Sequence, residues 1–67
     1  MAHRRIQINY ENRQIGSFAW AYRRYHPNDV FPVIYQGWDR NWDSHTWHDL
    51  DGESYFADEL VFIEHEI

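Results

Sequence analysis

Apolar and polar residues alternate over several short stretches of this chain, which is the pattern of strands with one buried face. In residues 5–10 the apolar positions Ile6, Ile8 and Tyr10 fall on one side. Residues 30–35 are the most apolar segment and are expected to form a central strand. Pro32 cannot donate to a ladder, so we expect it at the strand start or on an edge side. Residues 46–48 and 60–65 are two further short strands.

Residues 15–25 fit two elements. As a strand, the segment places the rings of Phe18, Trp20 and Tyr22 on one face and small residues on the other. As a helix, it begins at Ser17 and ends before Pro27. Its aromatic density favours the strand.

The segments between these strands are polar. Residues 37–44 are expected to form a hairpin loop that carries tryptophan, residues 49–52 a turn, and residues 53–59 one short helical turn. Five short strands in 67 residues predict a single all-β domain, 1–67, folded as a small five-stranded SH3-like barrel with a helical turn before the last strand. Its predicted core consists of Ile8, Phe18, Val33, Ile34, Leu60 and Phe62, with Val61 and Ile63 as neighbours of the last.

Three segments carry a resemblance to a known family. They are the run from Phe31 to Asp39, the run from Tyr55 to Glu64, and Gly16-Ser17-Phe18-Ala19. Together they resemble the SH3-like barrels of photosynthetic electron transport, the PsaE-type and ferredoxin-docking subunits. The resemblance implies the fold: a glycine turn, a core strand, and a helical turn that leads into the closing strand. Ferredoxin docking requires a basic surface, so we expect the fold and not the activity to carry over.

Composition excludes several kinds of chemistry. Four Trp, five Tyr and four Phe supply large rings for a small core, while Leu50 and Leu60 are the only leucines. The absence of cysteine excludes a disulfide, a zinc-thiolate site and a thiol nucleophile. No apolar run approaches the ~20 residues of a membrane span, and no signal peptide is evident. We therefore expect a cytoplasmic protein with no membrane partner.

Charge divides the chain into two halves. Residues 1–38 carry five arginines against two acids, a net charge of +3, and residues 39–67 carry one arginine against nine acids, a net charge of −8. The net charge of −5 steers a partner with a basic surface and repels others.

The acidic half carries Trp42 and Trp47, two of the four tryptophans, and Trp38 lies directly before it. Trp and Tyr are the usual anchors of protein interfaces, and acids beside exposed rings favour a cationic partner. We therefore expect a non-enzymatic protein-binding module, either an accessory subunit of a larger complex or a small virus-type inhibitor that covers a basic nucleic-acid-binding surface. The predicted partner-binding residues are Tyr35, Trp38, Asp39, Trp42, Asp43, Trp47, Asp49, Asp51 and Glu53.

Two alternatives belong to other classes. A nucleic-acid-binding barrel would use the N-terminal arginines, with tyrosines for stacking, but the net charge of −5 opposes direct binding. The residues concerned are Arg4, Arg5, Arg13, Arg23, Arg24, Tyr22 and Tyr25. A metal-binding protein would use His45 and His48, which converge only if their segment is helical or tightly turned.

Other chemistry has little support in the sequence. A calcium loop built on residues 49–52 fails because its first ligand would be Trp47. No spacing fixes a catalytic triad, and we expect no catalytic residue, no metal site and no cofactor.

Overall fold

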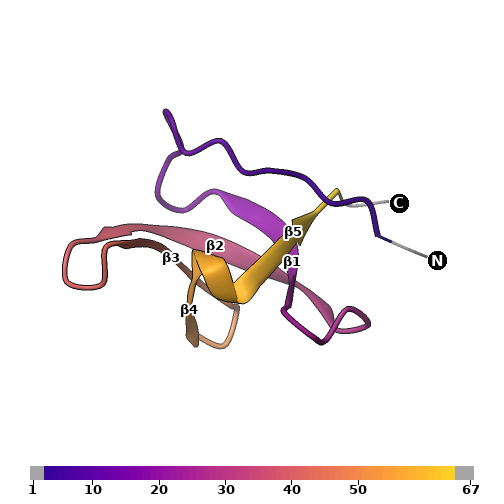
Figure 1. Cartoon of the computed structure of the whole chain (residues 1–67). Helices are drawn as coiled ribbons and strands as arrows, with labels where there is room; N and C mark the ends of the chain where they lie inside the picture. Colours follow the sequence, from indigo (N-terminus) through magenta and orange to yellow (C-terminus); the bar gives the residue numbers. More distant parts are fainter. Residues whose placement is uncertain (1–2, 65–67) are drawn as a thin grey trace.

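The computed structural model describes residues 3–64 and is all-β, as predicted (Figure 1). Its strands are β1 (Phe18–Arg23), β2 (Val30–Asp39), β3 (Ser44–His48), β4 (Ser54–Phe56) and β5 (Leu60–Ile63), with the 3₁₀ turn η1 (Ala57–Glu59) before the last strand. All strand pairs are antiparallel, in the order β4-β3-β2-β1-β5. The predicted central strand is therefore central, while β4 and β5 are the two edges of a sheet that is not closed.

Pro32 lies within β2 and not at the strand start. The backbone N–H of Tyr35 donates to Ser17 O, which lies on the β1 side of β2. Because N–H groups alternate in direction along a strand, the nitrogen of Pro32 points to the opposite side, where β3 lies. On that side β3 begins to pair with β2 only at Ile34. A residue without an N–H is tolerated there because no ladder partner is lost.

The strand prediction within residues 15–25 is confirmed over Phe18–Arg23, and Phe18, Trp20 and Tyr22 share one face as predicted, but the prediction of Phe18 as a core residue is wrong. Ala21 is wholly buried, whereas Phe18 is 60% exposed. Ala21 pairs with Phe31 on one side and Phe62 on the other, and paired residues share a face. Rings from both neighbouring strands fill the inner face, so β1 contributes small residues there and turns Phe18 outward.

The core lies on this inner face. Of its predicted members, Val33, Leu60 and Phe62 are buried there. Their neighbour Ile63 is also buried, but it pairs with Trp20 on the other face. Ile34 and Ile8 are only half-buried, although Ile8 packs against the core cluster. The prediction left out three buried rings of the core cluster, those of Tyr35, Trp47 and Tyr55.

The N-terminal segment is not the predicted strand over residues 5–10. Arg5 forms one isolated bridge with Ile63, and the N–H of Ile6 donates to Phe62 O, so only residues 4–6 follow the outer edge of β5. Beyond this point the segment leaves the edge and crosses the inner face (Figure 1), where Ile8 and Tyr10 pack on the core. Covering that face buries more apolar surface than a continued edge strand would.

Residues 53–59 also differ from the expected single helical turn. Ser54–Phe56 pairs with β3 as the edge strand β4, and only Ala57–Glu59 is helical. The carboxylate of Glu59 accepts the N–H of Phe56 at 3.0 Å, which fixes the start of η1. The last strand ends at Ile63, and His65 lies outside the described residues.

Candidate functional site

The β2–β3 hairpin extends from the body of the molecule and carries two of the predicted contact rings (Figure 1). Its turn, residues 40–43, is fixed by Asp39, whose Oδ1 accepts the N–H of Asn41 at 2.9 Å and of Trp42 at 3.3 Å. Trp38 is 52% exposed and Trp42 is 69% exposed. The hairpin therefore presents two large rings on a turn that is held by hydrogen bonds.

A β-bulge orients Trp38. The pairing of β2 with β3 shifts between Tyr35 and Gly37, so that Trp38 pairs with His45. The extra residue reverses the alternation of side chains beyond it, which places Trp38 on the same face as Tyr35. Gly37 has φ +106, and a Cβ there would lie 3.2 Å from Ile15 Cδ1, so glycine suits this position both in conformation and in space.

Trp38 and Trp42 lie on opposite faces of the hairpin. Trp38 meets His45 edge to face, with ring centroids 4.8 Å apart, whereas Trp42 contacts Phe56 at 5.7 Å. Phe56 pairs with Thr46, the neighbour of His45, and neighbours along a strand face opposite ways. The hairpin is therefore a two-sided wedge, and the two rings do not form one aromatic cage.

Two other predicted contact residues, Tyr35 and Trp47, belong to the core. Trp47 is wholly buried, and its Nε1 donates to the hydroxyl of Tyr10 at 3.2 Å. The hydroxyl of Tyr35 hydrogen-bonds Nδ1 of His45 at 2.7 Å. Both side chains are buried at the base of the hairpin and are therefore not accessible to a partner.

The turn between β3 and β4 holds the other predicted acids. Oδ1 of Asp49 accepts the N–H groups of Asp51 and Glu53, both at 2.9 Å, and its Oδ2 accepts the hydroxyl of Tyr55 at 3.0 Å. Burial acts to raise the pKa of the Asp49 carboxyl, but hydrogen bonds from Glu53, Tyr55, Asp51 and Gly52 together lower it. Asp49 therefore stays ionised and organises the turn.

This turn forms one wall of an open groove of about 450 Å³. Four acids line it, Asp29, Asp49, Asp51 and Glu53, against one arginine, Arg23. Its apolar lining comes from Phe31, Pro32, Leu50 and Tyr55. An acidic groove with an apolar lining suits the long stem and charged head of an arginine or lysine.

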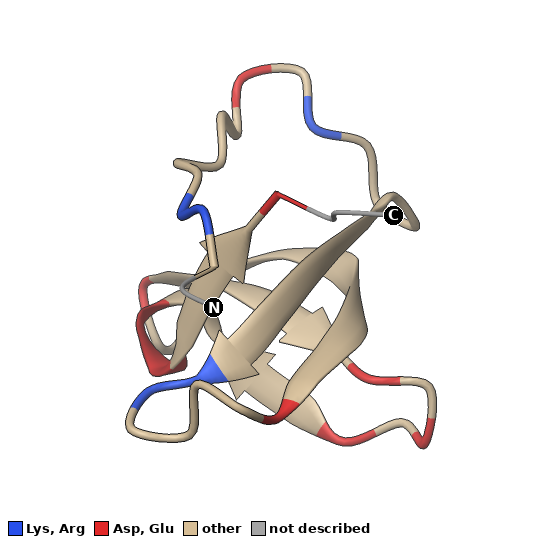
Figure 2. Ribbon diagram, turned by 90° about the vertical axis from the view of Figure 1, so that its right-hand side faces the viewer, with Lys and Arg blue, Asp and Glu red and all other residues tan. Residues whose placement is uncertain are grey.

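The acidic half does not form one continuous face. Asp39 and Asp43 lie before β3, whereas Asp49, Asp51 and Glu53 follow it, and the five residues of that strand separate the two groups by about 16 Å. Figure 2 shows acidic residues on loops on several sides of the molecule. The acidic groove also borders Arg23, so basic and acidic halves meet there.

The two histidines proposed for a metal site do not converge. His45 and His48 are three residues apart on β3, so their rings lie on opposite faces. Nδ1 of His45 is engaged by Tyr35, and Nδ1 of His48 lies 2.9 Å from Asp49 O. Within residues 3–64, no group of three or more histidine, cysteine, aspartate or glutamate side chains is placed to hold a metal ion.

Sequence reasoning missed Phe56 and Leu50 as parts of the candidate surfaces. Phe56 supports Trp42, and Leu50 stands exposed beside the acidic groove. The apolar Leu50 within an acidic turn was a visible signal, because turn residues are usually polar. The contact of Phe56 with Trp42 depends on the register between β3 and β4, which no local pattern reveals.

Compared with known proteins, the chain matches no family model, no curated protein and no solved structure. Among residues 3–64, no helix is long and apolar enough to cross a membrane.

Proposed function

We propose that this chain is a non-enzymatic protein-binding module with an SH3-like barrel fold, and that the wedge of the β2–β3 hairpin is its main contact. Two observations support the barrel. The 3₁₀ turn lies directly before the last strand, and the N-terminal segment runs from the edge of β5 across the inner face to the rings of β3. This segment partly bridges the open side of the sheet.

The observation that carries the binding proposal is the exposure of Trp38 and Trp42 on a supported hairpin. Each ring rests against another ring, His45 or Phe56, while half or more of its surface faces solvent. A ring held in place loses little entropy on binding, and tryptophan is the commonest interface anchor. A wedge with one anchor on each face fits a cleft in a partner better than a flat surface.

The partner presents a basic surface. Asp39 and Asp43 lie at the two ends of the hairpin turn, and Asp58 and Glu59 follow Phe56 in η1. The hairpin turn carries one basic residue, Arg40. The chain carries a net charge of −5, which speeds association with a basic partner. An accessory subunit of a larger complex and an inhibitor of a nucleic-acid-binding protein both meet this description. The inhibitor competes with nucleic acid for the partner, whereas the accessory subunit does not.

Binding kinetics with the partner captured from the source cell test this proposal. We expect Trp42→Ala to speed dissociation about 30-fold or more, because hot-spot truncations cost about 2 kcal/mol or more. The matched control is Phe18→Ala, which removes a ring of similar exposure from the outer face of β1, away from the hairpin turn. If Phe18→Ala weakens binding and Trp42→Ala does not, the wedge is not the contact surface.

Charge variants test the nature of the partner. Asp39→Asn combined with Asp43→Asn should slow association and flatten its dependence on salt. Asparagine keeps the side-chain oxygen that accepts the N–H groups of Asn41 and Trp42, so the turn is preserved. The control, Glu11→Gln with Glu64→Gln, removes the same charge from residues outside both the hairpin and the acidic groove. Equal effects of the two pairs would assign the steering to net charge alone.

A further inference from the structure

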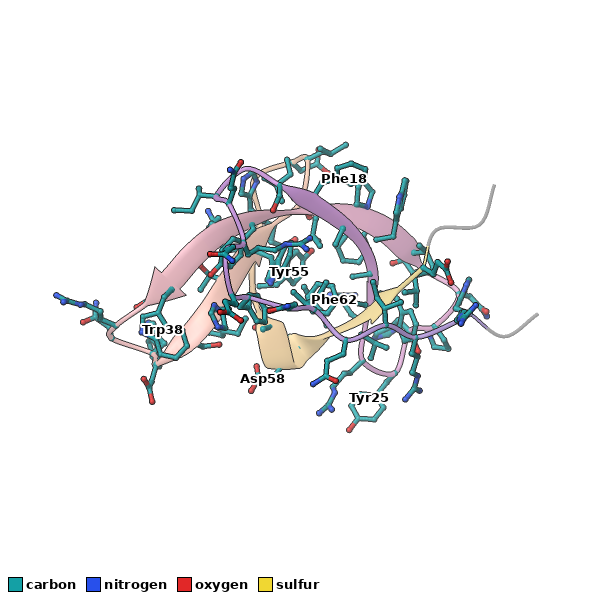
Figure 3. The ribbon with its side chains drawn as sticks, turned by 90° about the horizontal axis from the view of Figure 1, so that it is seen from above. Phe18, Tyr25, Trp38, Tyr55, Asp58 and Phe62 are labelled. Carbon is teal, nitrogen blue, oxygen red and sulfur yellow. The ribbon has the colours of Figure 1, made fainter. Side chains whose placement is uncertain are left out.

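Two arginines, Arg5 and Arg24, meet at the end of the sheet opposite the wedge. Arg5 comes from the N-terminal segment beside β5, and Arg24 follows β1, with its N–H donating to Glu59 O at 3.0 Å. Both line a surface hollow of about 440 Å³, together with Tyr22, Tyr25, Pro27 and Val61. Two arginines 19 positions apart in sequence thus meet beside the ring of Tyr25, which Figure 3 shows away from Trp38.

Tyr25 is presented outward by a strained backbone. Its φ is +72, a conformation that is an outlier for a bulky residue, and its side chain is 91% exposed. Glycine or asparagine would make this turn at lower cost, and the exposed ring adds little to folding. A strained residue that projects an aromatic ring into the same hollow as two arginines points to a binding role.

We propose that single-stranded nucleic acid binds here, with a base stacked on Tyr25 and backbone phosphates on Arg5 and Arg24. Single-strand sites combine aromatic rings, on which bases stack, with cationic side chains that follow the backbone. This site is separate from the wedge and does not rest on the protein-binding proposal. The ten residues of β2 place the two surfaces about 30 Å apart.

Local charge favours this ligand despite the net charge of −5. The hollow of Arg5 and Arg24 has no acid in its lining. The nearby carboxylate of Glu64 is paired with Arg4 at 3.4 Å, the one ion pair found within residues 3–64. Asp39 and Asp43 lie at the far end of β2, several Debye lengths away at ~0.1 M salt.

Acidic residues in the neighbouring hollow limit where the bound nucleic-acid strand can run. The neighbouring hollow of about 380 Å³ combines Arg23, Arg24, Tyr25 and His26 with Asp58 and Glu59. Arg23 also borders the acidic groove of Asp49, Asp51 and Glu53. Phosphates are therefore repelled on the Arg23 side and accepted on the Arg5 side.

Two of the residues predicted for a nucleic-acid-binding barrel are not available to this ligand. The guanidinium of Arg13 lies 5.4 Å from the ring centroid of the buried Trp47, and Tyr22 is buried. The ligand site is therefore small, with two phosphate contacts and one stacking ring. Such a site binds weakly, and its affinity falls with salt at a modest log–log slope of about −1.4.

Fluorescence anisotropy of the full chain with labelled oligothymidine and oligouridine, from about 20 to 200 mM salt, tests the proposal. We expect Tyr25→Asn to weaken binding about 5- to 150-fold, while Tyr25→Phe retains it. Asparagine accepts positive φ, so the folded state is not penalised. We expect Arg5→Ala with Arg24→Ala to flatten the log–log salt slope by about 1.4.

Arg40→Ala is the matched control, because it removes an exposed arginine from the hairpin turn at the other end of β2. It should change neither the affinity nor the slope by a comparable amount. Absence of binding at the lowest salt overturns the proposal, as does an equal loss in Arg40→Ala. Binding that polyglutamate displaces as well as unlabelled oligothymidine, or that is indifferent to Tyr25→Asn, shows a general anion surface and also overturns it.

Discussion

The ring of Tyr10 lies flat on the imidazole of His45, with centroids 3.6 Å apart and planes inclined by 2°. The two residues are 35 positions apart, so this stack holds the N-terminal segment against β3. The Tyr10 hydroxyl also accepts the Nε1–H of the buried Trp47. One side chain thus covers the core and satisfies its largest buried donor.

Tyr10 variants should separate these two contributions to stability. We expect Tyr10→Phe to lower the free energy of unfolding by about 1 kcal/mol, because the stack stays and one hydrogen bond is lost. Tyr10→Ala should cost about 3 kcal/mol, since the ring contacts with His45, Tyr35 and Trp47 disappear as well. Urea unfolding followed by tryptophan fluorescence measures both. Equal losses would show that the stack contributes nothing.

His45 should make stability depend on pH. Burial lowers its pKa below the ordinary 6.5, so the unfolded chain takes up a proton first as the pH falls. The stability that His45 contributes is therefore fully present above about pH 6.5 and decreases as the pH falls below it. The groups around it are Tyr10, Tyr35 and Trp38, none of which is anionic at this pH.

The measurement is the melting temperature of the wild type and of His45→Phe between about pH 7.5 and 5. Phenylalanine keeps a flat ring for Tyr10 to stack on but does not titrate. We expect the wild type to lose more stability on acidification than the variant does. Parallel curves for wild type and His45→Phe would contradict the prediction.

Strands β1, β2, β3 and β5 could be predicted from the sequence because alternation and aromatic density are local signals, whereas the strand predicted over residues 5–10 is wrong. The hairpin followed from the polar residues between two predicted strands. The orientation of β1 could not, because both of its faces carry apolar residues and only pairing with Phe31 and Phe62 decides between them. The edge strand β4 was missed because a three-residue strand has too little alternation to show.

The outward position of Phe18 and the buried position of Ala21 lead to a direct test. We expect Phe18→Thr to change the free energy of unfolding by less than about 1 kcal/mol, since the ring is mostly exposed and threonine suits a strand. Ala21→Val should cost about 1–3 kcal/mol, because it adds volume between Phe31 and Phe62. Chemical denaturation of both variants gives the comparison. A larger cost for Phe18→Thr would place that ring in the core.

The candidate site was only partly predictable. The polar sequence of the hairpin predicted exposed tryptophans there, and Trp38 and Trp42 are exposed. Trp47 has the same local surroundings but is buried, because its position opposite Tyr35 and Tyr55 turns it inward. The gathering of Arg5 and Arg24 depends on the bridge between the N-terminal segment and β5, a contact between opposite ends of the chain.

Tyr55 should ionise far above the ordinary range for a phenol. Burial, followed by its hydrogen bond to Asp49 and the nearby charges of Asp49 and Glu53, raises the pKa of Tyr55 to about 12. The folded chain keeps this proton while the unfolded chain releases it near pH 10, so its contribution to stability is present below about pH 10 and decreases as the pH rises toward 12.

Absorbance titration of the phenols, followed together with near-ultraviolet circular dichroism, separates ionisation of the folded chain from unfolding. We expect the highest phase, near pH 12, to move toward the ordinary value of 10 in Asp49→Asn, which keeps a side-chain oxygen for the turn but removes the charge beside the Tyr55 hydroxyl. Glu11→Gln removes the same charge from the loop before Arg13 and should leave this phase in place. If the phase does not move in Asp49→Asn, the Asp49 carboxylate does not hold the proton on Tyr55. The acidic turn would then be organised by its backbone hydrogen bonds alone.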